Sequence, residues 1–223
     1  MRSSAPTPNP DRKEEDLPGS QKKMKILAVD ASGEPGSIAI IDDGRLIEEV
    51  VLAAGDGFAQ VLFGEMEKLL ARHALKLTDI DGFASASGPG TFTGLRVGLA
   101  AVKGLGEALS RKVVAVSNLK AMADFGTRAL RAPWLDARRG DIYGAVYNAA
   151  LELVQEEVVM KRDAWLASLP AEVEILSEPR PLAGAIGRIA AREFAAGRGL
   201  DPIAIDANYV RRADAEMMWK DVV

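Results

Sequence analysis

The chain has 223 residues, 48% of them hydrophobic, enough to bury the core of one large domain or two small ones. It has no cysteine and one histidine, His73, which excludes disulfides, thiolate zinc sites, a cysteine nucleophile and a metal site built on paired histidines. A net charge of −4 argues against a broad basic face that binds nucleic acid alone. No apolar run is long enough to cross a bilayer and no signal-peptide pattern is present, so we expect a cytoplasmic protein without membrane contact.

The chain is expected to begin with a disordered extension and then a β-meander. Residues 1–23 carry four prolines among Ser, Asn, Asp, Glu and Lys, with little to bury, and folding is expected to begin at Met24. Apolar runs at 25–30, 37–41 and 45–52 predict three strands. Asp42-Asp43-Gly44 between the last two runs predicts a hairpin turn.

Helices and strands are then expected to alternate. Apolar residues at helical spacing predict a helix from Phe58 to about His73, and a second helix is expected over 95–110. Strands are expected at 82–86 and 113–116. The resulting order βββαβαβ places helices against a mixed sheet.

The stretch Ser87-Gly-Pro-Gly-Thr-Phe-Thr-Gly-Leu-Arg96 connects a strand to the second helix. Gly88 and Gly90 can adopt positive φ and admit a close backbone, and Pro89 fixes the bend between them. Thr91 or Thr93 can cap the helix, whose free N–H groups and dipole favour an anion. The stretch is therefore either a phosphate-binding loop or a tight connection whose threonines only cap.

The second helix is unusually rich in glycine. Gly94, Gly98, Gly104 and Gly106 each cost roughly 0.8 to 1.0 kcal/mol relative to alanine in a helix interior, so close packing must offset the loss. Gly94 and Gly98 lie one turn apart and leave one face almost free of side chains. That face is expected to pack either on the chain's own sheet or first helix, or against a partner.

The second half repeats the first in outline. A helix is expected over 117–125, strands within 132–147 and over 151–160, helices over 161–169 and 181–196, and short strands at 173–175 and 203–205. In each half an aspartate, Asp30 or Asp136, follows an apolar strand. Two βββα-type halves predict an internally duplicated α/β fold with a cleft between them.

Two features suggest nucleotide chemistry and one opposes it. Asp30 and Ser32 in Asp-Ala-Ser-Gly suit a magnesium-bound phosphate, and Gly184-Ala-Ile-Gly187 lies either in an adenine pocket or in a closely packed helix. The second turn, however, has Arg138 and Arg139 where a close approach to phosphate requires glycine. An ATP-hydrolysing enzyme is therefore the alternative hypothesis rather than the first.

Four segments resemble, in order and spacing, the bacterial TsaB (YeaZ) family: 24–32, 88–98, 135–143 and 209–212. The resemblance implies an α/β, actin-like (ASKHA, ribonuclease H-like) duplicated fold with mixed sheets flanked by helices. Its subdomains would be 24–118, which carries the partner-binding helices, and 119–223.

The resemblance also implies a function. Members of the family are non-catalytic subunits that bind TsaD. With TsaE, the complex transfers a threonylcarbamoyl group to the adenosine next to the anticodon (t6A) in tRNAs that read codons beginning with A. The family implies pairing with TsaD through the N-terminal helices, a homodimer when alone, and contact with tRNA through the complex. It implies no cofactor on this chain alone, with ATP or ADP and Mg at the level of the complex, and nothing in the sequence supports peptidase activity.

Site residues follow from the resemblance and the pattern together, with no catalytic residue and no metal ligand expected. The expected partner interface comprises Phe58, Leu62, Met66, Gly94, Gly98, Ala101 and Leu105. The expected anion-binding residues are Asp30, Ser32, Gly88, Gly90, Thr91 and Thr93. Arg138 and Arg139 are the expected tRNA contacts. Phe58-Ala59 stands where many relatives carry a His-Ser or His-Thr pair, which alters the chemistry at the interface.

Overall fold

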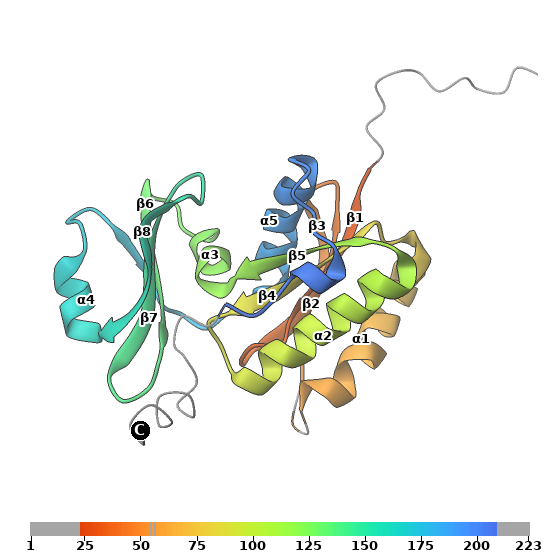
Figure 1. Ribbon diagram of the computed structural model, residues 1–223, viewed down its shortest axis with the longest axis horizontal. Helices are drawn as coiled ribbons and strands as arrows, with labels where there is room; N and C mark the ends of the chain where they lie inside the picture. Colours follow the sequence, from red (N-terminus) through yellow and green to blue (C-terminus); the bar gives the residue numbers. More distant parts are fainter. Residues whose placement is uncertain (1–22, 54, 56, 209–223) are drawn as a thin grey trace, which may run out of the picture.

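The computed structural model of the chain describes residues 23–53, 55 and 57–208, which form two β-sheets with helices packed around them (Figure 1). The first sheet has the order β3-β2-β1-β4-β5 and the second β8-β7-β6-β9. The strands are β1 Lys25–Asp30, β2 Gly36–Asp42, β3 Arg45–Leu52, β4 Gly82–Gly88, β5 Lys112–Ser117, β6 Leu130–Asp136, β7 Asp141–Asn148, β8 Leu153–Lys161 and β9 Glu174–Leu176.

The two sheets share one topology. In each, the first three strands form an antiparallel meander and the fourth pairs in parallel with the first, as β4 does with β1 and β9 with β6. The first sheet adds β5 in parallel beside β4. The predicted duplicated α/β fold with mixed sheets is confirmed.

Helices cover both faces of the first sheet. Helices α1 Phe58–Arg72 and α2 Phe92–Leu109 lie side by side on one face (Figure 1). The opposite face is covered by α3 Asn118–Ala123 and α5 Ala183–Ala195. Successive side chains of a strand point to opposite faces, so Ile26 packs with α3 and α5 while Leu27 packs with α1 and α2.

The second sheet has a smaller core. Helix α4 Arg162–Ser168 packs on β7 and β8 and buries Trp165 completely against Ile142 and Val146. Two short 3₁₀ turns, η1 Leu77–Asp79 and η2 Pro202–Ala204, complete the described elements. No helix within these residues is long and apolar enough to cross a membrane.

Two local predictions are wrong. Helix α2 begins at Phe92 instead of residue 95, with Thr91 as its N-cap residue, although the Thr91 hydroxyl makes no capping hydrogen bond. The strand predicted at 203–205 is the turn η2, because Pro202 has the φ of a helical first position and Ala204 N–H donates to the carbonyl of Asp201 at 2.9 Å.

The expected division into subdomains at residues 118 and 119 stays a prediction. Helix α5 follows the second sheet in sequence but packs on β1 and β2 of the first. Of the predicted N-terminal extension, residues 1–22 lie outside the described residues, as does the 209–212 segment of the family resemblance.

Candidate functional site: a cleft between the two sheets

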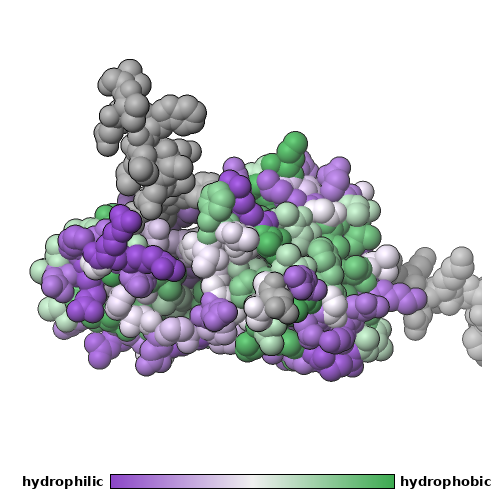
Figure 2. Space-filling view, turned by 90° about the horizontal axis from the view of Figure 1, so that it is seen from below, coloured by the Kyte–Doolittle hydropathy of each residue, from purple (hydrophilic) through white to green (hydrophobic). Residues whose placement is uncertain are grey.

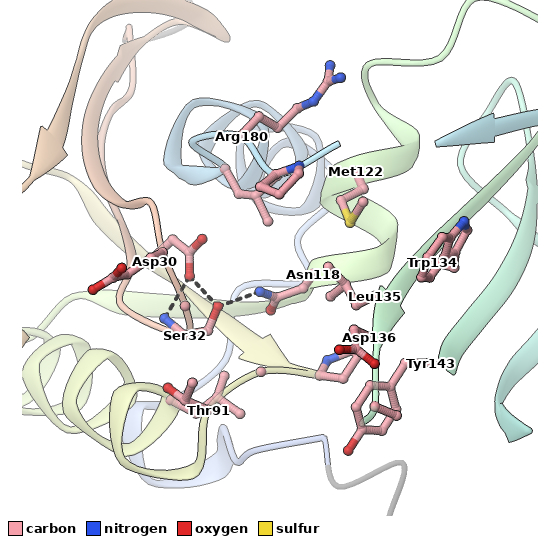
Figure 3. Close-up of a pocket in the computed structure, with 18 of the residues that line it drawn as sticks. Asp30, Ser32, Thr91, Asn118, Met122, Trp134, Leu135, Asp136, Tyr143 and Arg180 are labelled. Carbon is pink, nitrogen blue, oxygen red and sulfur yellow. Dashed lines mark hydrogen bonds between the residues drawn. The ribbon is translucent and has the colours of Figure 1, made fainter. Parts of the chain in front are cut away.

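A cleft of about 750 Å³ separates the two sheets at the carboxyl ends of β1 and β4. Figure 3 shows the residues of the first sheet's turns facing those of β6 and β7 across it. Its lining includes Asp30, Ser32, Gly90 and Thr91 on one side and Trp134, Leu135, Asp136, Arg138 and Tyr143 on the other. The volume falls within the range of small-molecule sites.

Asp30 lies at the floor of the cleft in a chain of hydrogen bonds. Ser32 donates to Asp30 Oδ1 from its backbone N–H at 2.9 Å and from its hydroxyl at 2.5 Å, and Asn118 Nδ2 donates to Ser32 Oγ at 2.5 Å (Figure 3). Asp30 is only 2% exposed, and this burial raises the pKa of its carboxyl above the ordinary value despite the bonds from Ser32. The carboxylate is held in a nearly water-free position.

Replacing Asp30 with asparagine tests this burial. A carboxyl with a raised folded-state pKa binds its proton more tightly in the fold, so the native protein loses stability as pH rises from 3.8 through that pKa. Asp30→Asn keeps an acceptor for Ser32 and removes the buried charge. We expect the variant to be more stable at pH 7 by roughly 1 kcal/mol, a typical single-site effect. Urea unfolding between pH 4 and 8 measures this difference in the free energy of unfolding. A difference between the variant and the native chain that becomes smaller toward neutral pH would contradict the prediction.

The loop after β4 packs on the turn after β1. Gly88 has φ 113° and its N–H donates to Asn118 Oδ1 at 3.0 Å, while the N–H of Thr91 donates to the Ser32 carbonyl at 2.5 Å. A Cβ on Gly90 would lie 2.7 Å from Cβ of Ser32. The chain's own groups therefore already use the N–H groups of Gly88 and Thr91.

The predicted anion-binding residues separate into two groups. Asp30, Ser32, Gly90 and Thr91 meet at the cleft. Gly88 is buried behind it, and Thr93 lies exposed in the first turn of α2. Phosphate binding by these residues stays a prediction.

The second turn, between β6 and β7, carries backbone strain. Arg138 and Arg139 have φ of 66° and 55°, a left-handed conformation that costs about 1–2 kcal/mol per residue outside glycine. The N–H of Arg138 donates to Asp136 Oδ1 at 2.8 Å. Both arginine side chains are exposed, so they can meet a partner, although the turn lacks the glycines of a phosphate-binding hairpin.

The surroundings of the glycines of α5 favour close packing of the helix on the first sheet, and not an adenine pocket. A Cβ on Gly184 would meet Glu49 Oε2 at 2.8 Å, and one on Gly187 would overlap Ile41. The first N–H groups of the helix are also used, because Ala183 N donates to Ser37 Oγ at 3.0 Å and Gly184 N to Glu49 Oε1 at 2.9 Å. A carboxylate of the chain itself thus occupies this helix N-terminus.

Most of the predicted partner interface faces inward. Gly94 and Gly98 pack on the chain's own sheet, where a Cβ on Gly94 would overlap the Ala31 carbonyl oxygen and one on Gly98 would lie 3.0 Å from Ser85 Oγ. Leu62, Met66 and Ala101 are also buried, while Phe58 and Leu105 are partly exposed. The five buried residues cannot supply a contact surface in this fold.

The outward face of the same two helices carries exposed apolar and small residues that the sequence prediction of the interface did not include. Phe63 is 54% exposed and Phe92 50%, and the guanidinium of Arg96 stacks 3.8 Å from the Phe92 ring centroid. Gly64 and Gly104 have open space around them. The lack of charge at positions 100, 104 and 108, one turn apart, is the sequence signal that could have identified this face.

His73 lies outside the cleft, at the end of α1. Its Nε2 is 2.7 Å from Glu48 Oε2, and Arg72 donates to the other Glu48 oxygen at 2.8 Å. Hydrogen bonds from Arg72 and then His73 lower the pKa of the Glu48 carboxyl. Among the described residues, no three His, Cys, Asp or Glu side chains are grouped so that they could hold a metal ion.

Two sheets with one strand order and a cleft between them define an actin-like protein. A family model described as TsaD, tRNA N6-adenosine threonylcarbamoyltransferase, matches residues 53–185. The tRNA threonylcarbamoyladenosine biosynthesis protein TsaB of Escherichia coli is 34% identical over 131 residues, which are 56% of this chain and 55% of that protein. TsaB of Bacillus subtilis is 32% identical over 152 residues, 66% of each chain.

A solved structure of a protein from the same family has a similar fold. YeaZ from Pseudomonas aeruginosa is 26% identical, with a TM-score of 0.71 over 83% of this chain and 99% of that one. The chain belongs to the TsaB (YeaZ) family of TsaD-related proteins, which has the actin-like ASKHA fold. Its alignments span about half to two thirds of the length of these curated relatives.

Proposed function

We propose that this chain is a non-catalytic subunit in the biosynthesis of t6A in tRNA, and that it binds TsaD through the outward face of α1 and α2. The observation that carries the proposal is the exposed apolar surface of these two helices. They fall within the segment matched by the TsaD family model, so TsaD is expected to present a similar helix pair.

The outward face suits helix-to-helix packing. Along α2 the exposed positions Arg96, Ala100 and Gly104 follow one another a turn apart, and α1 adds Phe63 and Gly64. Small residues let a facing helix approach closely, and exposed phenylalanines are typical interface anchors. Figure 2 shows green and white residues gathered over the middle of the right-hand lobe, which carries α1 and α2.

Gly104→Arg tests the interface without damaging the fold. Gly104 is exposed with no atom near its Cβ position, so the change should raise the free energy of unfolding by about 0.8 kcal/mol through helix propensity. The bulky guanidinium would separate two packed helices, and we expect the Kd for TsaD to rise about 100-fold. Calorimetric titration and co-elution with TsaD measure the effect.

The matched control is Ala167→Arg, which adds the same side chain at an exposed position of α4. It should leave TsaD binding unchanged. Equal affinity of the Gly104→Arg variant and the native chain would remove the outward face from the interface. Gly98 is unsuitable for this test, because its Cβ position is filled by the chain's own sheet.

The other components of the proposal follow from the family. TsaE and tRNA join through the complex, ATP or ADP and Mg act at that level, and the same helix face forms a homodimer when the chain is alone in the cytoplasm. The exposed side chains of Arg138 and Arg139 are the proposed tRNA contacts. Neutralising both should reduce the salt dependence of tRNA binding by the complex.

One observation favours the alternative, an ATP-hydrolysing enzyme. Asp30 and Ser32 lie at the cleft beside the loop 88–91, where a cation-bound phosphate would fit their chemistry. ATP turnover by the isolated chain that is lost in Asp30→Ala would establish it. No turnover, together with loss of tRNA modification when this chain is omitted from a reconstituted system, supports the non-catalytic role.

A further inference from the structure

The wall of the cleft formed by the second sheet is apolar and open. Trp134 and Leu135 on β6 and Tyr143 on β7 are only partly buried, although each packs against a core cluster with part of its surface. Met122 and Leu182 extend this wall (Figure 3 shows Met122, Trp134, Leu135 and Tyr143). Half-buried aromatic and aliphatic side chains around a concave site favour an apolar occupant.

The chain itself leads into this cleft. Asn208 is one of the lining residues, its backbone N–H donates to the Ser87 carbonyl at 2.7 Å, and its Nδ2 donates to Glu157 Oε2 at 2.7 Å. Residue 208 is thus fixed at the cleft by both its backbone and its side chain. Residues 209–223 continue directly from this point.

The sequence of residues 209–223 complements the cleft. It contains the apolar group Met217-Met218-Trp219, which begins nine residues after Asn208 and can reach up to about 30 Å from it. Arg211, Arg212 and Lys220 are balanced by Asp214, Glu216 and Asp221, so the complementarity lies in the apolar group and not in charge.

We propose that residues 209–223 bind in the cleft of their own chain. Met217, Met218 and Trp219 pack on the wall formed by Trp134, Leu135 and Tyr143. Attachment at Asn208 gives the segment a high effective concentration, so weak contacts suffice.

Disulfide trapping tests the proposal in the full chain, which has no native cysteine. Met218→Cys is combined with Ser177→Cys at the cleft, or with Ala167→Cys on α4 as the control; both partner positions are exposed. We expect the cleft pair to form an intramolecular disulfide at least about 10-fold faster, as proximity in one chain requires. Equal rates would overturn the proposal, and a disulfide formed only between molecules would assign the cleft to a second copy.

Hydrogen exchange provides a second measurement without added cysteines. The full chain is compared with the variant Met217→Ser, Met218→Ser, Trp219→Ser, whose changes lie outside the described fold. We expect the amides of residues 137–140, 177, 178 and 180 to exchange about 10-fold faster in the variant, while those of 62–70 in α1 stay unchanged. Unchanged exchange in the cleft segments would overturn the proposal, as would protection there that arises only when ATP is added.

Discussion

Gly94→Ala is expected to lower the free energy of unfolding by about 3 kcal/mol, even though alanine is the better helix former. A Cβ at residue 94 would overlap the carbonyl oxygen of Ala31 and lie 2.6 Å from Thr91 Oγ1. Neither group can move freely, because the turn around Ala31 is held by the bonds of Ser32 to Asp30 and of Thr91 to Ser32. Urea unfolding at neutral pH measures the loss.

Gly104→Ala, ten residues further along the same helix, is the matched control. Its Cβ would meet no atom within 4 Å, so only helix propensity changes, and we expect a gain of about 0.8 to 1.0 kcal/mol. One substitution thus has opposite signs on two sides of α2. A gain in stability at both positions would mean that the first turn of α2 and the turn after β1 are not in close contact.

Local patterns predicted the regular elements well. Asp43 and Gly44 adopt φ of 52° and 76°, the left-handed pair that a two-residue hairpin between β2 and β3 requires, and this preference can be read directly from the two residue types. The continuous apolar run of β1 is likewise typical of a strand buried on both faces. Such features depend on neighbours in sequence.

The sequence could not predict what packs against the face of α2 that carries Gly94 and Gly98. A side-chain-poor stripe at Gly94 and Gly98 has the same pattern whether a sheet of the same chain or another protein approaches it. The deciding group, the carbonyl of Ala31, lies some sixty residues earlier in the sequence. The sequence therefore left open the two alternatives that the fold resolves in favour of the chain's own sheet.

The polar contacts that join the two sheets were not predicted at all. Glu156 and Glu157 are neighbours on β8, and only Glu157 points toward the first sheet. The register between β7 and β8 shifts at Gly144 and Val146, so side chains of β8 do not simply alternate between the two faces of the sheet. Neither glutamate could therefore be assigned to a face from its sequence position.

Glu157→Ala is expected to destabilise the protein by about 3 kcal/mol and to loosen the two sheets from each other. The Glu157 carboxylate accepts hydrogen bonds from Ser117 Oγ, from Tyr147 OH at 2.7 Å and from Asn208 Nδ2 at 2.7 Å. Tyr147 is 2% exposed, and burial, followed by the nearby Glu157 charge, raises the pKa of its hydroxyl. Losing the carboxylate removes the charged partner of the buried Tyr147 hydroxyl, whereas the exposed Asn208 can turn to water.

A double-mutant cycle separates this coupling from simple loss of packing. Tyr147→Phe alone should cost about 1.5 to 3 kcal/mol, the value of a hydrogen bond to a charged group. Because a phenylalanine ring has no hydroxyl to leave unpaired, the double variant Tyr147→Phe, Glu157→Ala should be more stable than the sum of the single losses predicts, with a coupling of about 1 kcal/mol or more. Urea unfolding gives the four free energies, and hydrogen exchange at 205–208 reports release of Asn208. Additive losses with unchanged exchange would show that Glu157 does not hold the two sheets together.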